Sequence, residues 1–272
     1  MENTATPKKK KVGRVLLIIL LVIVLMIGAL AGFIAYNANE NMKVMNRTLD
    51  EGMQALSERA DINELDAGEY SEIKLYGVMK FDVKQYEVEE LGNLSVMKVN
   101  MGLMQMVSYI ITPYEKDMPM LSMDFMYILG NRKAYAEFYD LTADKEAPEY
   151  VAVLDNIREF EGKYADLEDI ATEPAWYDDL LTVVLHKAGK KKDDDKIREM
   201  FSDAIETYME QADGLELLSD EAEAEKVGIT QEYCDNLVEK GGVSTDVFKK
   251  ELGEEKTKDF FNKVLFGTEL YK

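Results

Sequence analysis

Two carboxylates in the stretch DMPMLSMDFMYILGNRKAYAEFYDL, residues 117–141, have the type and spacing needed for proton transfer. Asp124 stands among Met, Leu, Phe and Tyr in a segment typical of a buried strand, and Glu137 lies in the next such segment. The Gly130-Asn131 pair between them predicts a tight hairpin turn. Because side chains alternate along a strand, five polar residues are predicted to share one face. They are Ser122, Asp124, Tyr135, Glu137 and Tyr139.

The chemistry of this face depends on the register of the two strands, which decides the residue that lies opposite Asp124. A two-residue turn places Asp124 opposite Glu137, whereas a four-residue turn places it opposite Tyr139. Repulsion between carboxylates and partial burial both raise a carboxyl pKa, so one of the pair is expected to hold a proton near neutral pH. We therefore interpret Asp124 and Glu137 as catalytic and Ser122, Tyr135 and Tyr139 as ligand-binding. The alternative is a partly wet face whose carboxylates point at water or backbone donors.

The remaining candidates for chemistry are few. His186 is the only histidine and Cys234 the only cysteine, so the sequence predicts no metal site, no histidine-based nucleophilic triad and no intrachain disulfide. We expect His186 at a strand end or in a helix, and Cys234 in the core. Glycine-rich nucleotide-binding motifs are absent, so no cofactor is predicted. The methionines at 101, 104 and 106 are interpreted as core residues and not as copper ligands.

The elements that must position these residues change character along the chain. From about residue 73 to 141 the apolar pattern has a period of two, and short turns predict an antiparallel sheet. The predicted strands are 74–91, 94–101, 103–112, 120–129 and 133–141. Alternate apolar residues from Leu121 to Leu129 form a second face that needs a covering layer. Helical regions at about 148–163, 195–212 and 230–265 are expected to supply it, and Lys187–Lys196 is expected to be an exposed loop.

The N-terminal segment is predicted to be a membrane anchor. Residues 15–36 contain no charge, and 22 residues at about 1.5 Å each are enough to cross a hydrocarbon core of about 30 Å. The basic tail 1–14 should remain in the cytoplasm, which places the rest of the chain outside. A cleaved signal peptide with a site at Ala29-Leu30-Ala31 is the alternative, and its apolar run would be unusually long. We therefore expect a single-pass cell-membrane protein.

Residues 37–68 follow the anchor with apolar residues spaced by three and four, which predicts an amphipathic helix. It is expected to act as a stalk or to pack on the domain formed by residues 69–272. The whole chain has a net charge of −21, and the first 14 residues carry five basic groups against one acidic group, so the remainder has a net charge of −25. This acidity argues against nucleic acid or anionic lipid as partners.

Three segments, taken in order, resemble the ferredoxin-dependent bilin reductases and the related red chlorophyll catabolite reductases. The first is ITPYEKDMPMLSMDFMYILGNRKAYAEFYDL, with the D-x-P-x-x-x-x-D pattern of that family. The second is EPAWYDDL, at residues 173–180, and the third is YCDNLVEKGGVSTDVFKKELGEEKTKDFFNKVLFG, at residues 233–267. The resemblance covers about residues 70–270. It implies a three-layer α/β/α sandwich around a central antiparallel sheet, with the substrate between the sheet and the C-terminal helices.

The resemblance also implies a role for Asp124. The second Asp of the family pattern donates protons to a linear tetrapyrrole, and it corresponds to Asp124 here. These reductases use no flavin or metal and receive electrons singly from ferredoxin. The chain departs from the family where some members carry a catalytic His, which falls near Val107, and where they carry C-terminal charged residues, which fall near Val238, Gly241 and Gly242. An acidic domain outside the cytoplasm also makes ferredoxin a doubtful partner.

Three functions therefore remain open at this point. We expect a membrane-anchored extracytoplasmic domain that binds a linear tetrapyrrole or another hydrophobic small molecule. The alternatives are a ferredoxin-dependent reductase of a linear tetrapyrrole and a non-catalytic structural or interaction domain of the cell envelope. Whether the domain is an enzyme, and which ligand it takes, do not follow from the sequence.

Overall fold

The chain begins with one very long helix. The computed structural model describes residues 8–272, apart from Val78 and residues 243–244. Residues 1–7 of the predicted basic tail thus lie outside the described residues, and α1 (Lys8–Ser57) starts directly after them. Within the described chain, the helix that contains Leu16–Ser57 is long and apolar enough, by length and composition, to cross a membrane.

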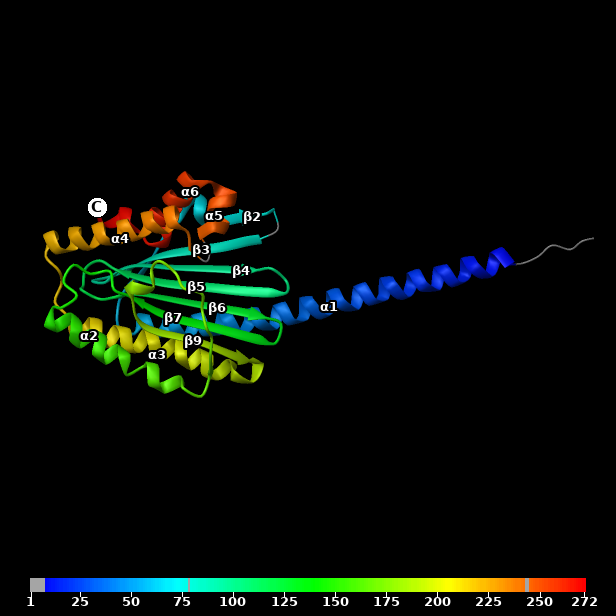
Figure 1. Cartoon of the computed structure of the whole chain (residues 1–272), viewed down its shortest axis with the longest axis horizontal. Helices are drawn as coiled ribbons and strands as arrows, with labels where there is room; N and C mark the ends of the chain where they lie inside the picture. The colour runs from blue at the N-terminus through cyan, green and yellow to red at the C-terminus, as the bar shows by residue number, and fades with distance from the viewer. Residues whose placement is uncertain (1–7, 78, 243–244) are drawn as a thin grey trace, which may run out of the picture.

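The two halves of α1 have different surroundings. Its N-terminal half projects away from the rest of the chain (Figure 1), and the apolar side chains from Leu16 to Ile27 are exposed. Its C-terminal half packs on the sheet and buries Met45, Leu49 and Leu56. The helix ends at Ser57 and not at residue 68 as predicted, because the residues that follow pair with the edge of β3 as strand β1 (Ile62–Leu65).

A nine-stranded antiparallel sheet forms the middle of the domain. Its order is β1-β3-β4-β5-β6-β7-β9-β8, and β2 also pairs with β3. The central strands are β3 (Met79–Val88), β4 (Gly92–Asn100), β5 (Met104–Pro113), β6 (Met120–Ile128), β7 (Asn131–Tyr139) and β9 (Leu181–Lys190). The short strands are β1, β2 (Glu72–Leu75) and β8 (Glu168–Asp169). The predicted antiparallel sheet is confirmed, with β1, β8 and β9 added to it. The predicted single strand 74–91 is wrong, because a turn after Leu75 divides it into β2 and β3, which pair with each other.

Helices cover both faces of this sheet, which confirms the predicted three-layer α/β/α sandwich (Figure 1). The first layer consists of the C-terminal half of α1 with α2 (Pro148–Arg158) and α3 (Asp194–Asp213). The other layer consists of α4 (Asp220–Lys240), α5 (Thr245–Leu252) and α6 (Glu254–Phe260). The helical region predicted at 230–265 is thus three helices, separated at Gly241 and Gly253, which have φ angles of 86° and 82°.

Strand β6 shows the alternation on which the site prediction rests. Leu121, Met123, Phe125 and Tyr127 are all buried in the core that α1 and α3 cover. The Phe125 ring lies edge-on to Phe201 of α3, with a centroid distance of 5.1 Å. The residues between them must therefore face the C-terminal helices.

The register of the β6–β7 hairpin differs from both predicted registers. Asp124 pairs with Tyr135, and Ser122 pairs with Glu137, because the turn is formed by Leu129 and Gly130. Leu129 takes a left-handed φ of 54°, and its carbonyl oxygen accepts hydrogen bonds from Asn41 of α1 at 3.1 Å and from Arg132 at 3.0 Å. A contact from the distant Asn41 and one from the nearby Arg132 thus stabilise a turn with a left-handed leucine, which the local sequence does not favour.

The segment Lys187–Lys196 is not the predicted exposed loop. It contains the end of β9, a single 3₁₀ turn and the start of α3. Lys187 is buried, and its ammonium group pairs with Asp169 of β8 at 2.5 Å. The lysine-rich sequence conceals the strand, because β9 is specified by its pairing with β7 along most of its length.

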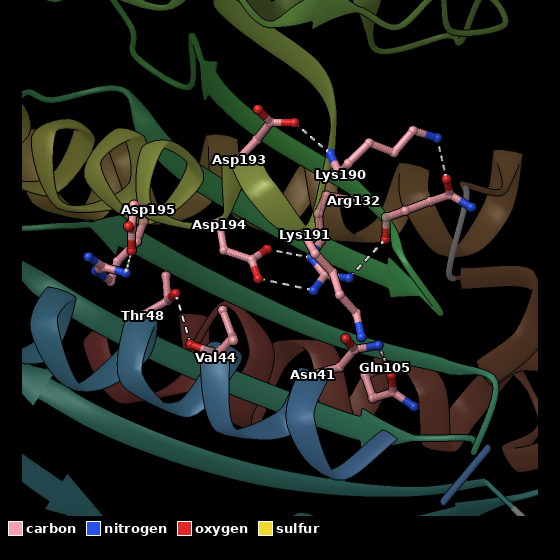
Figure 2. A network of polar contacts seen from close by, with 12 residues as sticks. Asn41, Val44, Thr48, Gln105, Arg132, Lys190, Lys191, Asp193, Asp194 and Asp195 are labelled. Atoms are coloured by element: carbon pink, nitrogen blue, oxygen red, sulfur yellow. Dashed lines mark hydrogen bonds and ion pairs between the residues drawn. The ribbon is translucent and has the colours of Figure 1, made fainter. Parts of the chain in front are cut away.

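A buried arginine joins β7 to α3 (Figure 2). Arg132 is 1% exposed, and its guanidinium pairs with both carboxylate oxygens of Asp194, at 2.5 Å and 3.1 Å. The guanidinium also lies over the Tyr127 ring, 4.0 Å from the ring centroid. Because Arg132 also holds the Leu129 carbonyl, one side chain connects the hairpin turn, the helix and the core.

We expect Arg132→Met to lower the free energy of unfolding by about 3–5 kcal/mol, because it leaves Asp194 as an uncompensated, largely buried charge. The double variant Arg132→Met/Asp194→Asn should recover a large part of this loss. Denaturant unfolding of the full chain in non-ionic detergent, followed by circular dichroism, measures both values. A double variant no more stable than Arg132→Met alone would contradict this account of the pair.

Candidate functional site

A cavity of about 460 Å³ lies between the sheet and the C-terminal helices. Its floor is formed by β5, β6, β7 and β9, and its opposite wall contains Tyr233 of α4 and Phe248 of α5. The segment 170–178, which carries Tyr177, closes one side. Met, Ile, Leu, Phe and Tyr make up more than half of the lining. The polar residues fall into a group on the floor and a second group, Thr172, Glu173, Asp178 and Thr245, on the walls.

The structure brings all five predicted residues to this cavity. Ser122, Asp124, Tyr135, Glu137 and Tyr139 each line it, on the face predicted from the alternation. Their shared face survives the error in register, because the actual pairing differs from the predicted ones by an even number of residues.

Asp124 has a single hydrogen-bond donor and an apolar environment. The Ser108 hydroxyl, directly opposite on β5, donates to Asp124 Oδ1. Burial raises the pKa of Asp124 to about 6, the hydrogen bond from Ser108 opposes the rise, and the nearby Glu137 adds to it. A carboxyl group in this range is available both as an acid and as a base near neutral pH.

Glu137 has different partners from Asp124. The Tyr139 hydroxyl donates to Glu137 Oε2 at 2.6 Å, and His186 Nε2 lies 2.6 Å from Glu137 Oε1. The His186 ring also lies edge-on to Tyr135, at a centroid distance of 5.1 Å. Burial raises the pKa of Tyr139 well above its ordinary value, so its hydroxyl remains a donor. The floor thus carries two carboxyl groups in distinct hydrogen-bonding environments.

Sequence reasoning missed two members of this polar group. His186 lies within β9, where Tyr135 is its partner on β7, and not at a strand end or in a helix. Ser108 lies opposite Asp124 only because β5 and β6 pair in this register. The apolar run before His186 was the available signal for a strand, whereas no local signal distinguishes Ser108.

An aromatic wall was also missed. Trp176 Nε1 donates to the Gly241 carbonyl oxygen at 2.8 Å, which ties the segment 170–178 to the end of α4. Tyr177 and Tyr233 flank the Tyr139 ring, with centroid distances of 6.1 Å and 5.5 Å. These tilted rings make the end of the cavity near Tyr139 aromatic.

The positions at which the chain departs from the reductase pattern lie in different parts of the domain. Val107 faces the core under α1 and α3, whereas its neighbour Ser108 faces the cavity. Gly242 lines the cavity, and Val238 is buried among the C-terminal helices. An imidazole is nevertheless present, because β9 supplies His186.

Other reactive groups lie away from the polar floor. Cys234 is fully buried in α4, and burial raises the pKa of its thiol well above the ordinary value, so it is a core residue as expected. Among the residues that the structure describes, no three His, Cys, Asp or Glu side chains lie close enough to hold a metal ion. The arrangement is suited to proton donation and hydrogen bonding toward a flat apolar ligand.

Comparison with solved structures identifies a relative in fold. The chain is similar to phytochromobilin synthase from tomato, crystallised in complex with biliverdin, with a TM-score of 0.64 and 16% sequence identity. The similarity covers 84% of this chain and 83% of the synthase. No protein-family profile and no curated protein matches the sequence. At this identity the similarity shows that the two proteins share a fold.

Asp124 should make stability depend on pH. Its folded pKa of about 6 lies above an ordinary 3.8, so the folded state binds the proton more tightly than the unfolded state does. This contribution is fully present below about pH 4 and is lost as pH rises through about 6, at about 1.4 kcal/mol per pKa unit. Relative to Asp124→Asn, the wild type should lose up to about 3 kcal/mol between pH 4 and 7.

Unfolding free energies measured across this pH range, with the exposed Asp50→Asn as matched control, provide the check. If Asp124→Asn instead costs about 1–3 kcal/mol at every pH, the carboxylate is a structural acceptor and the raised pKa is wrong.

Proposed function

We propose that the protein is a membrane-anchored, extracytoplasmic domain that binds a linear tetrapyrrole, or a similar flat conjugated molecule, in the cavity around Asp124. The observation that carries this proposal is the polar floor that contains Asp124, Glu137 and His186, in a cavity lined mainly by Met, Ile, Leu, Phe and Tyr. A cavity of about 460 Å³ is within the range used for small-molecule ligands.

The polar floor suits the heteroatoms of such a ligand. A linear tetrapyrrole presents N–H donors, imine nitrogens and lactam oxygens along one edge of a flat apolar framework. A protonated Asp124 donates to an imine nitrogen or a lactam oxygen, whereas a carboxylate accepts from a pyrrole N–H. The apolar rings would lie against Met106, Phe248 and Tyr233 on the surrounding walls.

The charged residues that line the cavity restrict which ligands it can bind. Of the lining residues in the described part of the chain, Lys133 and His186 are the two that can carry a positive charge. Lys133 is exposed and therefore suits an acidic substituent that remains in water. We accordingly favour a ligand with its acidic groups at one end, or with none.

Two further observations support the assignment. The fold is shared with a synthase whose crystals contained biliverdin, which makes a linear tetrapyrrole the first ligand to test. The charge-free run 15–36 behind the lysines 8–11 supports an anchor whose C-terminal domain lies outside the cytoplasm.

Reduction of the bound ligand is a second candidate function. The pKa of about 6 favours it, because Asp124 would then deliver protons at neutral pH while electrons arrive from a separate donor. Ferredoxin is a poor fit as that donor, since it is acidic and cytosolic while this domain has a net charge near −25. Binding without turnover is therefore the primary proposal.

We expect an absorbance titration of the full chain in detergent with biliverdin to give a saturable spectral shift. Met106→Trp, which places a larger side chain in the cavity, should weaken binding at least about tenfold, corresponding to about 1.4 kcal/mol. Leu217→Trp, at an exposed position far from the cavity, is the matched control and should bind as the wild type does. A flat titration with both biliverdin and haem would favour a non-catalytic interaction domain of the envelope.

The topology is tested by protease digestion of intact cells. Protease added outside should degrade the domain from residue 37 onward, and the tail 1–14 should become accessible only after permeabilisation. Full protection of the domain in intact cells would reverse the topology and restore a cytosolic donor as a candidate partner.

A further inference from the structure

Four turns lie at one end of the strands, beside the point where the N-terminal half of α1 leaves the domain (Figure 1). The pairings Leu75 with Met79, Asn100 with Gln105, Ile128 with Asn131, and Asn131 with Lys190 place these turns at the same end of the strands. We call this end the hairpin edge. It consists of Tyr76–Gly77, Met101–Leu103, Leu129–Gly130 and Lys190–Lys192.

No linker separates the hairpin edge from the apolar half of α1. Tyr36 at the end of the apolar run is 64% exposed, whereas Asn37 is 6% exposed and Asn41 is fully buried in the domain. Ile34 already lies beside Gly102 of the hairpin edge. Because the helix is continuous, and 22 residues at about 1.5 Å only just span the hydrocarbon core, the hairpin edge must lie at headgroup level if α1 crosses the membrane.

The hairpin edge carries apolar groups at this level. Leu103 at the tip of the β4–β5 turn is 50% exposed, and Tyr76 at the tip of the β2–β3 turn is 44% exposed. Together with Tyr36, these side chains have the types found where proteins meet the boundary between acyl chains and headgroups.

The hairpin edge is also basic, in a domain of net charge near −25. Lys190, Lys191 and Lys192 are exposed. The ammonium groups of Lys190 and Lys191 contact the neutral amide oxygens of Asn131 at 2.5 Å and Asn37 at 2.8 Å. Among the described residues, none of the three lysines pairs with a carboxylate, so their charge is available to lipid phosphates.

The three aspartates that follow these lysines cancel only part of this charge. Two of them pair with arginines, and Asp193 accepts a backbone hydrogen bond that leaves its negative charge in place, so three lysines stand against one carboxylate without a cationic partner among the described residues. Asp193 accepts from the backbone of Lys190, Asp194 pairs with the buried Arg132, and Asp195 pairs with Arg198 (Figure 2).

An apolar strip connects the hairpin edge to the cavity. On the cavity face of β5 and β6, the partly exposed residues Met104 and Ile128 lie next to the turns. Met106 and Met126, one step further along each strand on the same face, line the cavity. A hydrophobic molecule moving along this strip stays on apolar surface from the hairpin edge to the site.

We propose that the hairpin edge is a docking surface for anionic phospholipid headgroups and that the apolar strip admits the cavity's ligand from the bilayer. The proposal rests on the anchor and the ligand-binding function proposed above. It departs from the expectation, based on net charge, that anionic lipid is not a partner, because three exposed lysines lie together at the hairpin edge.

Docking is tested on the full chain reconstituted into vesicles of phosphatidylcholine with phosphatidylglycerol. Leu103→Cys and Leu217→Cys each receive an environment-sensitive nitrobenzoxadiazole label. Leu217 is the matched control, since it is 53% exposed and lies at the opposite end of the domain, and the native Cys234 is fully buried. The label at 103 should be blue-shifted and lose most of its emission to brominated lipid, whereas the label at 217 should be unaffected.

The charge is tested by replacing three lysines with glutamine. The variant Lys190→Gln/Lys191→Gln/Lys192→Gln should reduce the quenching at 103 and remove its dependence on phosphatidylglycerol and on salt. The matched variant Lys256→Gln/Lys258→Gln/Lys263→Gln has the same net charge but lies on α6 and the turn after it, and it should leave the quenching unchanged.

The outcomes separate docking from anchoring. Carbonate-resistant flotation with vesicles reports the anchor. Flotation with equal, unquenched labels at 103 and 217 would overturn docking while leaving the anchor intact, and a chain that does not float would overturn both.

The path along the strip is tested with biliverdin dimethyl ester dissolved in the vesicles. Met104→Glu, which places a charge on the strip outside the cavity, should slow transfer to the protein severalfold and leave the affinity measured in detergent unchanged. Equal transfer rates would overturn the path. Absence of binding to wild type in detergent would overturn the ligand-binding function itself, and the path with it, whereas the docking result would stand.

Discussion

The alternation of side chains along β6 is the constraint on which the rest of the structure depends. Burying Leu121, Met123, Phe125 and Tyr127 under α1 and α3 contributes roughly 1.5–3 kcal/mol for each side chain. A slip of one residue would expose all four and bury Asp124 in their place. The free energy gained by burying these side chains therefore exceeds the cost of about 3 kcal/mol for holding an ionised Asp124 in the cavity. The position of the polar residues thus follows from the packing of the apolar ones.

That polar face contains two carboxyl groups that their surroundings make unequal. Glu137 is contacted by Tyr139 and His186, both at 2.6 Å, while Asp124 has one hydroxyl partner in Ser108. Different environments for neighbouring carboxyl groups are the usual means of separating an acid from a base in one site. Tyr177 and Tyr233 add aromatic surface beside this floor, and Trp176 packs behind them. Recognition and proton transfer would thus use the same floor.

The helix α1 couples this site to its surroundings. Its C-terminal half supplies part of the buried layer beneath β6, and Asn41 holds the Leu129 carbonyl at the β6–β7 turn. Its N-terminal half is exposed and apolar. One continuous helix therefore contacts the hairpin that carries Asp124 and, if its N-terminal half crosses a membrane, would fix the position of the hairpin edge relative to that membrane. A flexible stalk would have left that orientation free.

The sequence by itself determined the features that depend on local period and composition. These are the anchor-like apolar run, the antiparallel sheet, the buried face of β6, and the shared face of Asp124 and Glu137, since alternation holds for any even register. Tertiary structure decided the rest. The hairpin turn moved to Leu129 because Asn41 and Arg132 bind its carbonyl, and His186 and Ser108 reached the site through pairings with β7 and β5. Apart from the bond from Arg132, these contacts join residues far apart in the chain, and no local pattern encodes them.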